Sequence, residues 1–70
     1  MKLSAYMKHH QYTQKDFIKK IKAATGYNLP QGTLAKYVLG QRFPRKKELN
    51  IIYETTNGLV SPNDFYLEQL

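Results

Sequence analysis

The polar and small residues between positions 29 and 44 form a pattern that could contact double-stranded DNA. If this stretch is a helix, with about 100° between successive residues, its outer side carries Gln31, Gly32, Ala35, Lys36 and Leu39. A glutamine amide can pair with adenine, a lysine can donate to guanine or phosphate, and an alanine methyl can contact the methyl group of thymine. The glycine keeps this side thin where a groove wall would approach. These residue types predict a helix that contacts bases in the major groove.

The opposite side of the same stretch is apolar and carries Leu34, Tyr37 and Val38. Their spacing matches one face of an α-helix, which predicts burial in a core. Gly40 predicts a left-handed residue that ends the helix. The basic residues that follow are Arg42, Arg45, Lys46 and Lys47. We therefore expect a helix over about residues 31–39, followed by a segment that contacts phosphates.

The charge of the chain is distributed unevenly. Residues 1–47 hold all eleven Lys and Arg with a single acid, Asp16, for a formal charge of +10. Residues 48–70 hold four acids and no base, for a formal charge of −4. A basic first part favours a polyanionic partner. The alternative is that these lysines only solvate the surface of a small helical protein.

Length and composition predict one small domain spanning residues 1–70. A chain of 70 residues leaves no room for a large substrate cavity, and without cysteine it has no disulfide or thiolate metal site. The apolar runs are too short for a membrane span, and the first residues lack the apolar stretch of a secretory signal. No pattern of nucleophile, base and acid suggests an enzyme. We expect a cytoplasmic protein that is not an enzyme and has no metal, cofactor, small-molecule ligand or membrane contact.

Four further helices are predicted around the candidate DNA-contacting helix. They run over about residues 3–10, 14–25 and 45–56, with a short last helix that begins near residue 62. Thr13 followed by Asp16 predicts a capping box, and Gly26 predicts the end of the second helix. Pro30 suits the start of the third helix. Since the alternation typical of strands is absent, the fold class expected is all-α, a compact bundle of about five short helices.

Helical spacing also predicts the core. The side chains expected to face inward include Leu3, Tyr6, Met7, Phe17, Ile18, Ile21, Leu34, Tyr37, Leu49, Ile52 and Tyr53. The last part of the chain is acidic and partly apolar, with Leu59, Val60, Phe65, Tyr66, Leu67 and Leu70. These residues either form a dimer surface or close the core of the monomer.

The stretch from Leu29 to Pro44, with the helix that begins at Thr13-Gln14, resembles the Cro and phage-repressor class of helix-turn-helix proteins, the XRE-like family. The recognition helix of that family often has the pattern polar-Gln-x-Thr/Ser-Ile/Leu-x-x-aromatic/Leu-x-x-Gly-basic-basic-x-Pro. The corresponding residues here are Gln31, Thr33, Leu34, Tyr37, Gly40, Gln41, Arg42 and Pro44. The segment from Tyr53 to Phe65 also resembles the end of small Cro-like regulators. The resemblance covers nearly the whole chain and implies a lambda-repressor-like helix-turn-helix domain.

The resemblance implies a role for each matching residue. Gln31 and Gly32 would lie deepest in the major groove, with Thr33, Ala35 and Lys36 along its walls. Phosphate contacts would come from Gln14 at its helix start, from Arg42 and Arg45, and from the amide of Gln41. Two further phosphate candidates are Lys15, near the same helix start, and Lys46, where a basic residue does not suit the helix dipole.

The clearest departure from the family is a spacing. Gln31 lies seventeen positions after Gln14, farther than the compact motif with its turn of about 3–4 residues needs. The extra residues must either lengthen the second helix or widen the connection.

These observations predict a sequence-specific DNA-binding repressor that acts by promoter occlusion. Since one short helix reads few base pairs, we expect a homodimer on a pseudo-palindromic operator with half-sites about 10 bp apart. Two alternatives are an antitoxin-like protein-interaction module and a sequence-neutral nucleic-acid binder.

Overall fold

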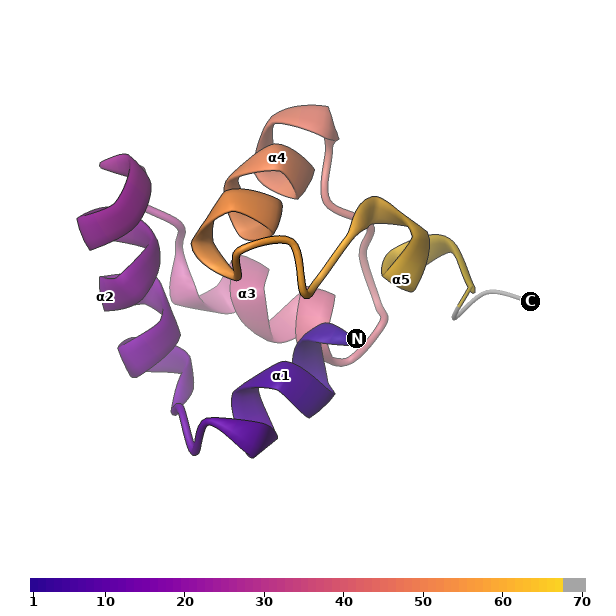
Figure 1. Ribbon diagram of the computed structural model, residues 1–70, viewed down its shortest axis with the longest axis horizontal. Helices are drawn as coiled ribbons and strands as arrows, with labels where there is room; N and C mark the ends of the chain where they lie inside the picture. The colour runs from indigo at the N-terminus through magenta and orange to yellow at the C-terminus, as the bar shows by residue number, and fades with distance from the viewer. Residues whose placement is uncertain (68–70) are drawn as a thin grey trace.

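The computed structural model describes the backbone of residues 1–67 and the side chains of residues 1–65. Five helices follow one another along the chain (Figure 1): α1 (Leu3–His9), α2 (Gln14–Thr25), α3 (Gln31–Val38), α4 (Lys46–Thr55) and α5 (Pro62–Leu67). No strand occurs over residues 1–67, so the all-α prediction is confirmed. The predicted ends of three helices were one residue too wide, since His10, Leu39, Arg45 and Thr56 flank the helices rather than belong to them. Within the part of the chain that the structure describes, no helix is long and apolar enough to cross a membrane.

The start of α2 is fixed by the predicted capping box. The main-chain N–H of Asp16 donates to Thr13 Oγ1 at 3.1 Å, and the main-chain N–H of Thr13 donates to Asp16 Oδ2 at 3.0 Å. Both bonds satisfy amides that a helix start otherwise leaves without partners. The position of Gln14, the first residue of α2, is therefore set by local sequence.

Left-handed residues end α1, α3 and α4. Gln11, Gly40 and Asn57 have φ values of 60°, 75° and 55°. After α3, the N–H of Gly40 donates to Tyr37 O at 3.2 Å and the N–H of Gln41 donates to Lys36 O at 2.9 Å. This pair of bonds is a Schellman motif, and it stops the helix sharply. The end at Gly40 was predicted, whereas the end of α1 at a left-handed glutamine was not.

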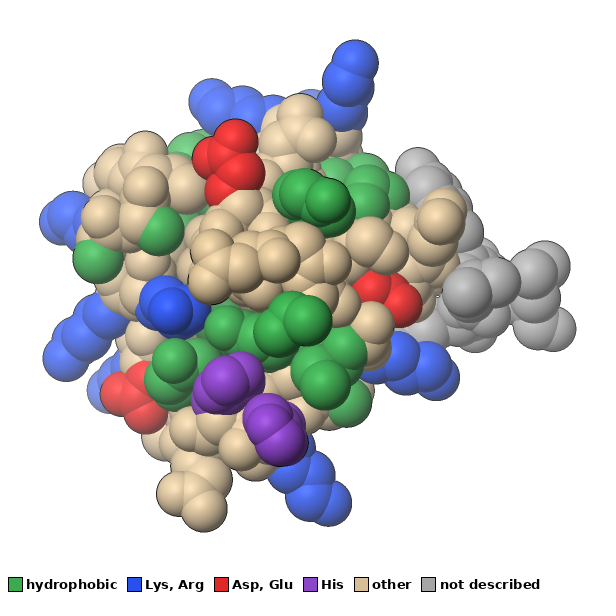
Figure 2. Space-filling model, in the orientation of Figure 1, with side chains coloured by type: hydrophobic (Ala, Val, Ile, Leu, Met, Phe, Trp, Pro, Cys, Tyr) green, Lys and Arg blue, Asp and Glu red, His purple; other side chains and the backbone are tan. Residues whose placement is uncertain are grey.

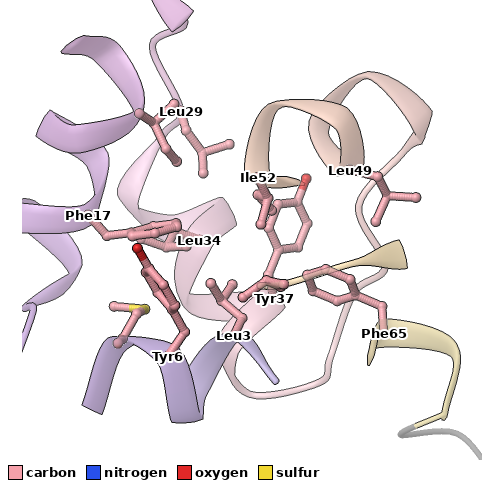
Figure 3. Packing of buried hydrophobic residues seen from close by; sticks show 12 residues of the cluster. Leu3, Tyr6, Phe17, Leu29, Leu34, Tyr37, Leu49, Ile52 and Phe65 are labelled. Carbon is pink, nitrogen blue, oxygen red and sulfur yellow. The ribbon is translucent and has the colours of Figure 1, made fainter. Parts of the chain in front are cut away.

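A single apolar cluster holds the helices together (Figure 3). Its members include Leu3, Tyr6, Met7, Phe17, Ile21, Leu29, Leu34, Tyr37, Leu49, Ile52, Val60 and Phe65. α2 packs against both α3 and α4, α1 packs against α3, and α5 packs against α4. The α3 side chains of Leu34 and Tyr37 are 0% and 4% exposed, as their spacing predicted. α3 is therefore anchored along one side, and its other side is available to a partner.

The prediction that Tyr53 faces the core is wrong, because 47% of its surface is exposed. The buried side of α4 runs through Leu49, Ile52 and Thr55 and continues to Thr56, just past the helix end. At about 100° per residue, this stripe is centred away from position 53. The hydroxyls of both threonines donate to main-chain oxygens one turn earlier, so these polar residues can be buried at little cost.

Two of the described residues of the last apolar segment close the core, which was one of the two roles expected for it. Val60 and Phe65 are 0% and 4% exposed, so these two side chains close the core of the monomer. Among the described side chains of the segment, Leu59 is the exposed one, with 52% of its surface accessible. The side chains of Tyr66 and Leu67, and the whole of Leu70, lie outside the described residues.

Candidate nucleic-acid interface

The first residues of α2 and α3 meet at one place on the surface. The side-chain Nε2 of Gln31 donates to Oε1 of Gln14 at 3.5 Å, across seventeen residues of sequence. The extra length noted in the sequence is shared by the helix and the connection, since α2 has 12 residues and residues 26–30 link it to α3. Leu29 in this connection is 4% exposed, so its burial fixes where α3 begins.

Four of the five predicted base-contacting residues lie on the outward side of α3, and the fifth, Thr33, lies at its edge. Gln31, Gly32 and Lys36 are exposed, whereas Thr33 and Ala35 are half-buried. A Cβ added to Gly32 would meet no atom within 4 Å, so nothing in the described chain requires a glycine there. Leu39, just past the helix end, is 69% exposed. Helical spacing placed Leu39 on this side, but the sequence alone assigned it no role.

The helix start of α3 has no side-chain cap. Pro30 is extended, with φ −62° and ψ 140°, and the first hydrogen bond of the helix runs from Leu34 N to Pro30 O at 3.1 Å. The amides of residues 31–33 precede that bond and point out of the helix end. A helix N-terminus of this kind favours negative charge.

The predicted phosphate-contacting residues fall into two groups along the chain. Gln14 and Lys15 begin α2, next to the start of α3 through the Gln14–Gln31 contact. The second group follows the C-terminal end of α3 and consists of Gln41, Arg42, Arg45 and Lys46, all exposed. An eight-residue helix is about 12 Å long, and the two groups lie at its opposite ends.

Two residues between positions 41 and 47 already make contacts within the chain. The main-chain N–H of Gln41 already donates to Lys36 O, so only its side-chain amide is left for a phosphate. The Nζ of Lys47 lies 5.2 Å from the centre of the Tyr27 ring, an internal cation–π contact. Arg45 is the N-cap residue of α4 and has no side-chain cap bond there. Arg42 and Arg45 are thus the better placed charges of this segment.

Asp16 is the acid nearest in sequence to Gln14 and Lys15, and it is already engaged, whereas Glu48 lies three residues after Arg45. Asp16 is the only acid in residues 1–47, and the hydrogen bonds from the main chain and side chain of Thr13 hold its pKa below the ordinary value.

Figure 2 shows the molecule in the orientation of Figure 1, with α3 towards the back. On the face shown, hydrophobic side chains and the two histidines gather in the middle, and most Lys and Arg side chains lie around its outline.

This geometry provides a helix side with amide, methyl and ammonium groups, and polar and basic side chains of the kinds that can bind anions lie at both of its ends. It suits a ligand that displays polar base edges between two rows of phosphates. In comparisons with known proteins, no protein family, no curated protein and no solved structure matches the chain.

Proposed function

We propose that this chain is a sequence-specific transcriptional regulator that binds duplex DNA through a lambda-repressor-like helix-turn-helix pair formed by α2 and α3. The observation that carries the proposal is the contact between Gln14 and Gln31 at 3.5 Å, which brings the starts of two helices together. Helix starts favour phosphate, and a glutamine amide can pair with adenine. One side chain of the contact is thus suited to the DNA backbone and the other to a base.

In the proposed complex, α3 lies in the major groove with its N-terminal end deepest. The residues that face base edges are Gln31, Gly32, Ala35 and Lys36, because they lie on the outward side of the helix. Thr33, at the edge of that side, lies along the groove wall. The phosphate contacts set the register of the protein on the duplex, since they bind equally to any sequence. They come from Gln14, Lys15, Gln41, Arg42, Arg45 and Lys46.

Regulation would occur by occlusion of a promoter. A helix of eight residues reads only a few base pairs, so useful specificity needs two copies of the chain on a pseudo-palindromic operator. The half-sites would lie about 10 bp apart, one turn of the duplex. Bound in this way, the homodimer covers the DNA that polymerase must reach.

The experiment that tests the proposal is a selection of binding sites from random duplex DNA at about 0.15 M salt, where non-specific phosphate binding is weakened. Enrichment of a two-fold-related sequence would support it. An unenriched pool with steep salt dependence would contradict it and indicate a sequence-neutral binder. An unenriched pool with no DNA retained at all would instead favour a protein-interaction module.

A further inference from the structure

Leu39 is the most exposed large hydrophobic residue of the described chain, with 69% of its surface accessible. Its φ of −82° and ψ of −4° continue the path of α3, so helical spacing applies to it. It follows Ala35 by four residues and Gly32 by seven, which places the three on one stripe of the helix surface. This stripe is the outward side already assigned to base contacts.

The three residues of the stripe increase in size from the start of α3 to its end. Gly32 has no side chain, although a Cβ there would meet nothing within 4 Å and alanine would be the better helix former. Ala35 adds one methyl group, and Leu39 adds a branched side chain of four carbons. A helix that lies tilted against its partner needs side chains that increase in size in this way, because its deep end touches the partner closely and its far end must bridge a wider gap.

The apolar character of the stripe identifies the chemical group that it fits. Among the base edges displayed in the major groove, the C5-methyl group of thymine is the apolar one. We propose that Leu39 is a specificity-determining residue that packs against the C5-methyl group of a thymine. This inference rests on the proposed function and adds a base preference at the far end of α3.

The test uses the duplex enriched in the selection and replaces each thymine singly by deoxyuridine, which removes only the C5-methyl group. The wild-type protein should lose about threefold to fourfold in affinity at one thymine of each half-site, the effect of burying one methyl group. Leu39→Ala should bind the thymine and deoxyuridine duplexes equally. Leu59→Ala is the matched control, because Leu59 is also exposed, at 52%, and lies outside α3; it should keep the wild-type ratio.

The outcomes separate this inference from the proposed function. If a sequence is enriched but no deoxyuridine lowers affinity, or if Leu39→Ala keeps the same loss, the role of Leu39 is wrong and the operator still supports a regulator. A change in self-association of Leu39→Ala without a change in the deoxyuridine ratio would assign the leucine to a protein contact and overturn the inference. If the selection enriches nothing, both fail.

Discussion

The side-chain amides of Gln14 and Gln31 lie 3.5 Å apart, a contact that joins the first residue of α2 to the first residue of α3. The distance is long for a hydrogen bond, and Gln31 is exposed. The contact is thus a weak one, which a stronger partner can replace. A phosphate held at Gln14 would place Gln31 against a base, which couples position on the backbone to the reading of sequence.

Replacement of Gln31 by alanine is expected to reduce sequence discrimination. The variant should lose about 1–3 kcal/mol on the selected operator at one or two base pairs and much less on unrelated DNA. Binding isotherms on the operator and on single-base variants would measure both. If Gln31→Ala kept the full sequence preference, α3 would not lie in the groove as proposed.

Replacement of Arg42 by alanine is expected to weaken binding to all sequences alike. Loss of one phosphate contact should lower the slope of log affinity against log salt by about one. Lys22→Ala makes the same charge change in the last turn of α2, eight residues or about 12 Å from Gln14, and should change the slope less. Equal slopes for the two variants would mean that Arg42 contributes only to the general field of the protein.

Replacement of Gly32 by alanine is expected to stabilise the protein and weaken its binding to DNA. The added Cβ meets nothing within 4 Å, and alanine is favoured over glycine within a helix by about 0.5–1 kcal/mol. Urea unfolding would measure the gain, and operator titration would measure the loss. Gly40→Ala is the contrasting control: φ is +75° there, so this change should lower the free energy of unfolding. A Gly32→Ala protein with unchanged affinity would show that no groove wall approaches that position.

The sequence predicted the helices well, because their starts and ends depend on neighbouring residues. Thr13 with Asp16, Gly26 and Gly40 act through local hydrogen bonds and local backbone conformation. The approach of Gln14 to Gln31 could not be predicted from the sequence in the same way. It depends on the angle between α2 and α3, which follows from packing around buried residues such as Leu29 rather than from any local pattern.

The sequence also could not predict which of two neighbouring apolar residues is buried. Leu59 and Val60 are adjacent and similar in hydrophobicity, yet one is 52% exposed and the other 0%. Tyr53 and Ile52 divide in the same way, with Ile52 inside. The chain path decides such pairs, because a small shift in the centre of a buried stripe moves one neighbour out. The DNA contacts of the exposed residues stay predictions of the sequence and of the helix geometry.

Replacement of Thr13 by alanine is expected to destabilise the fold by about 1 kcal/mol, the usual value for loss of an N-cap. The change removes the acceptor of the Asp16 N–H, which lies 3.1 Å away, and leaves that amide to water. Thr13→Ser retains the hydroxyl and should keep most of the stability in urea unfolding. If both variants unfolded at the wild-type midpoint, the capping box would contribute nothing to global stability.

Acid is expected to destabilise the protein partly through Asp64. Burial of this carboxylate raises its pKa, but hydrogen bonds from the main chain and hydroxyl of Ser61 and from the Met1 amino group outweigh that effect. The pKa of Asp64 therefore lies below its ordinary value of 3.8. The folded state then binds the proton less readily than the unfolded state, so the stabilisation is fully present above the unfolded value and is lost as pH falls through the folded one.

Urea unfolding of the wild type and of Asp64→Asn across the acid range would measure this contribution. The variant should be less stable than the wild type at neutral pH, because its amide is a weaker acceptor for Ser61 and carries no charge for the Met1 amino group, 3.0 Å away. Its free energy of unfolding should fall less steeply in acid. Some dependence should remain, because the pKa of Asp16 is also lowered, first by the main-chain hydrogen bond from Thr13. Parallel curves for the two proteins would assign the acid sensitivity to groups other than Asp64.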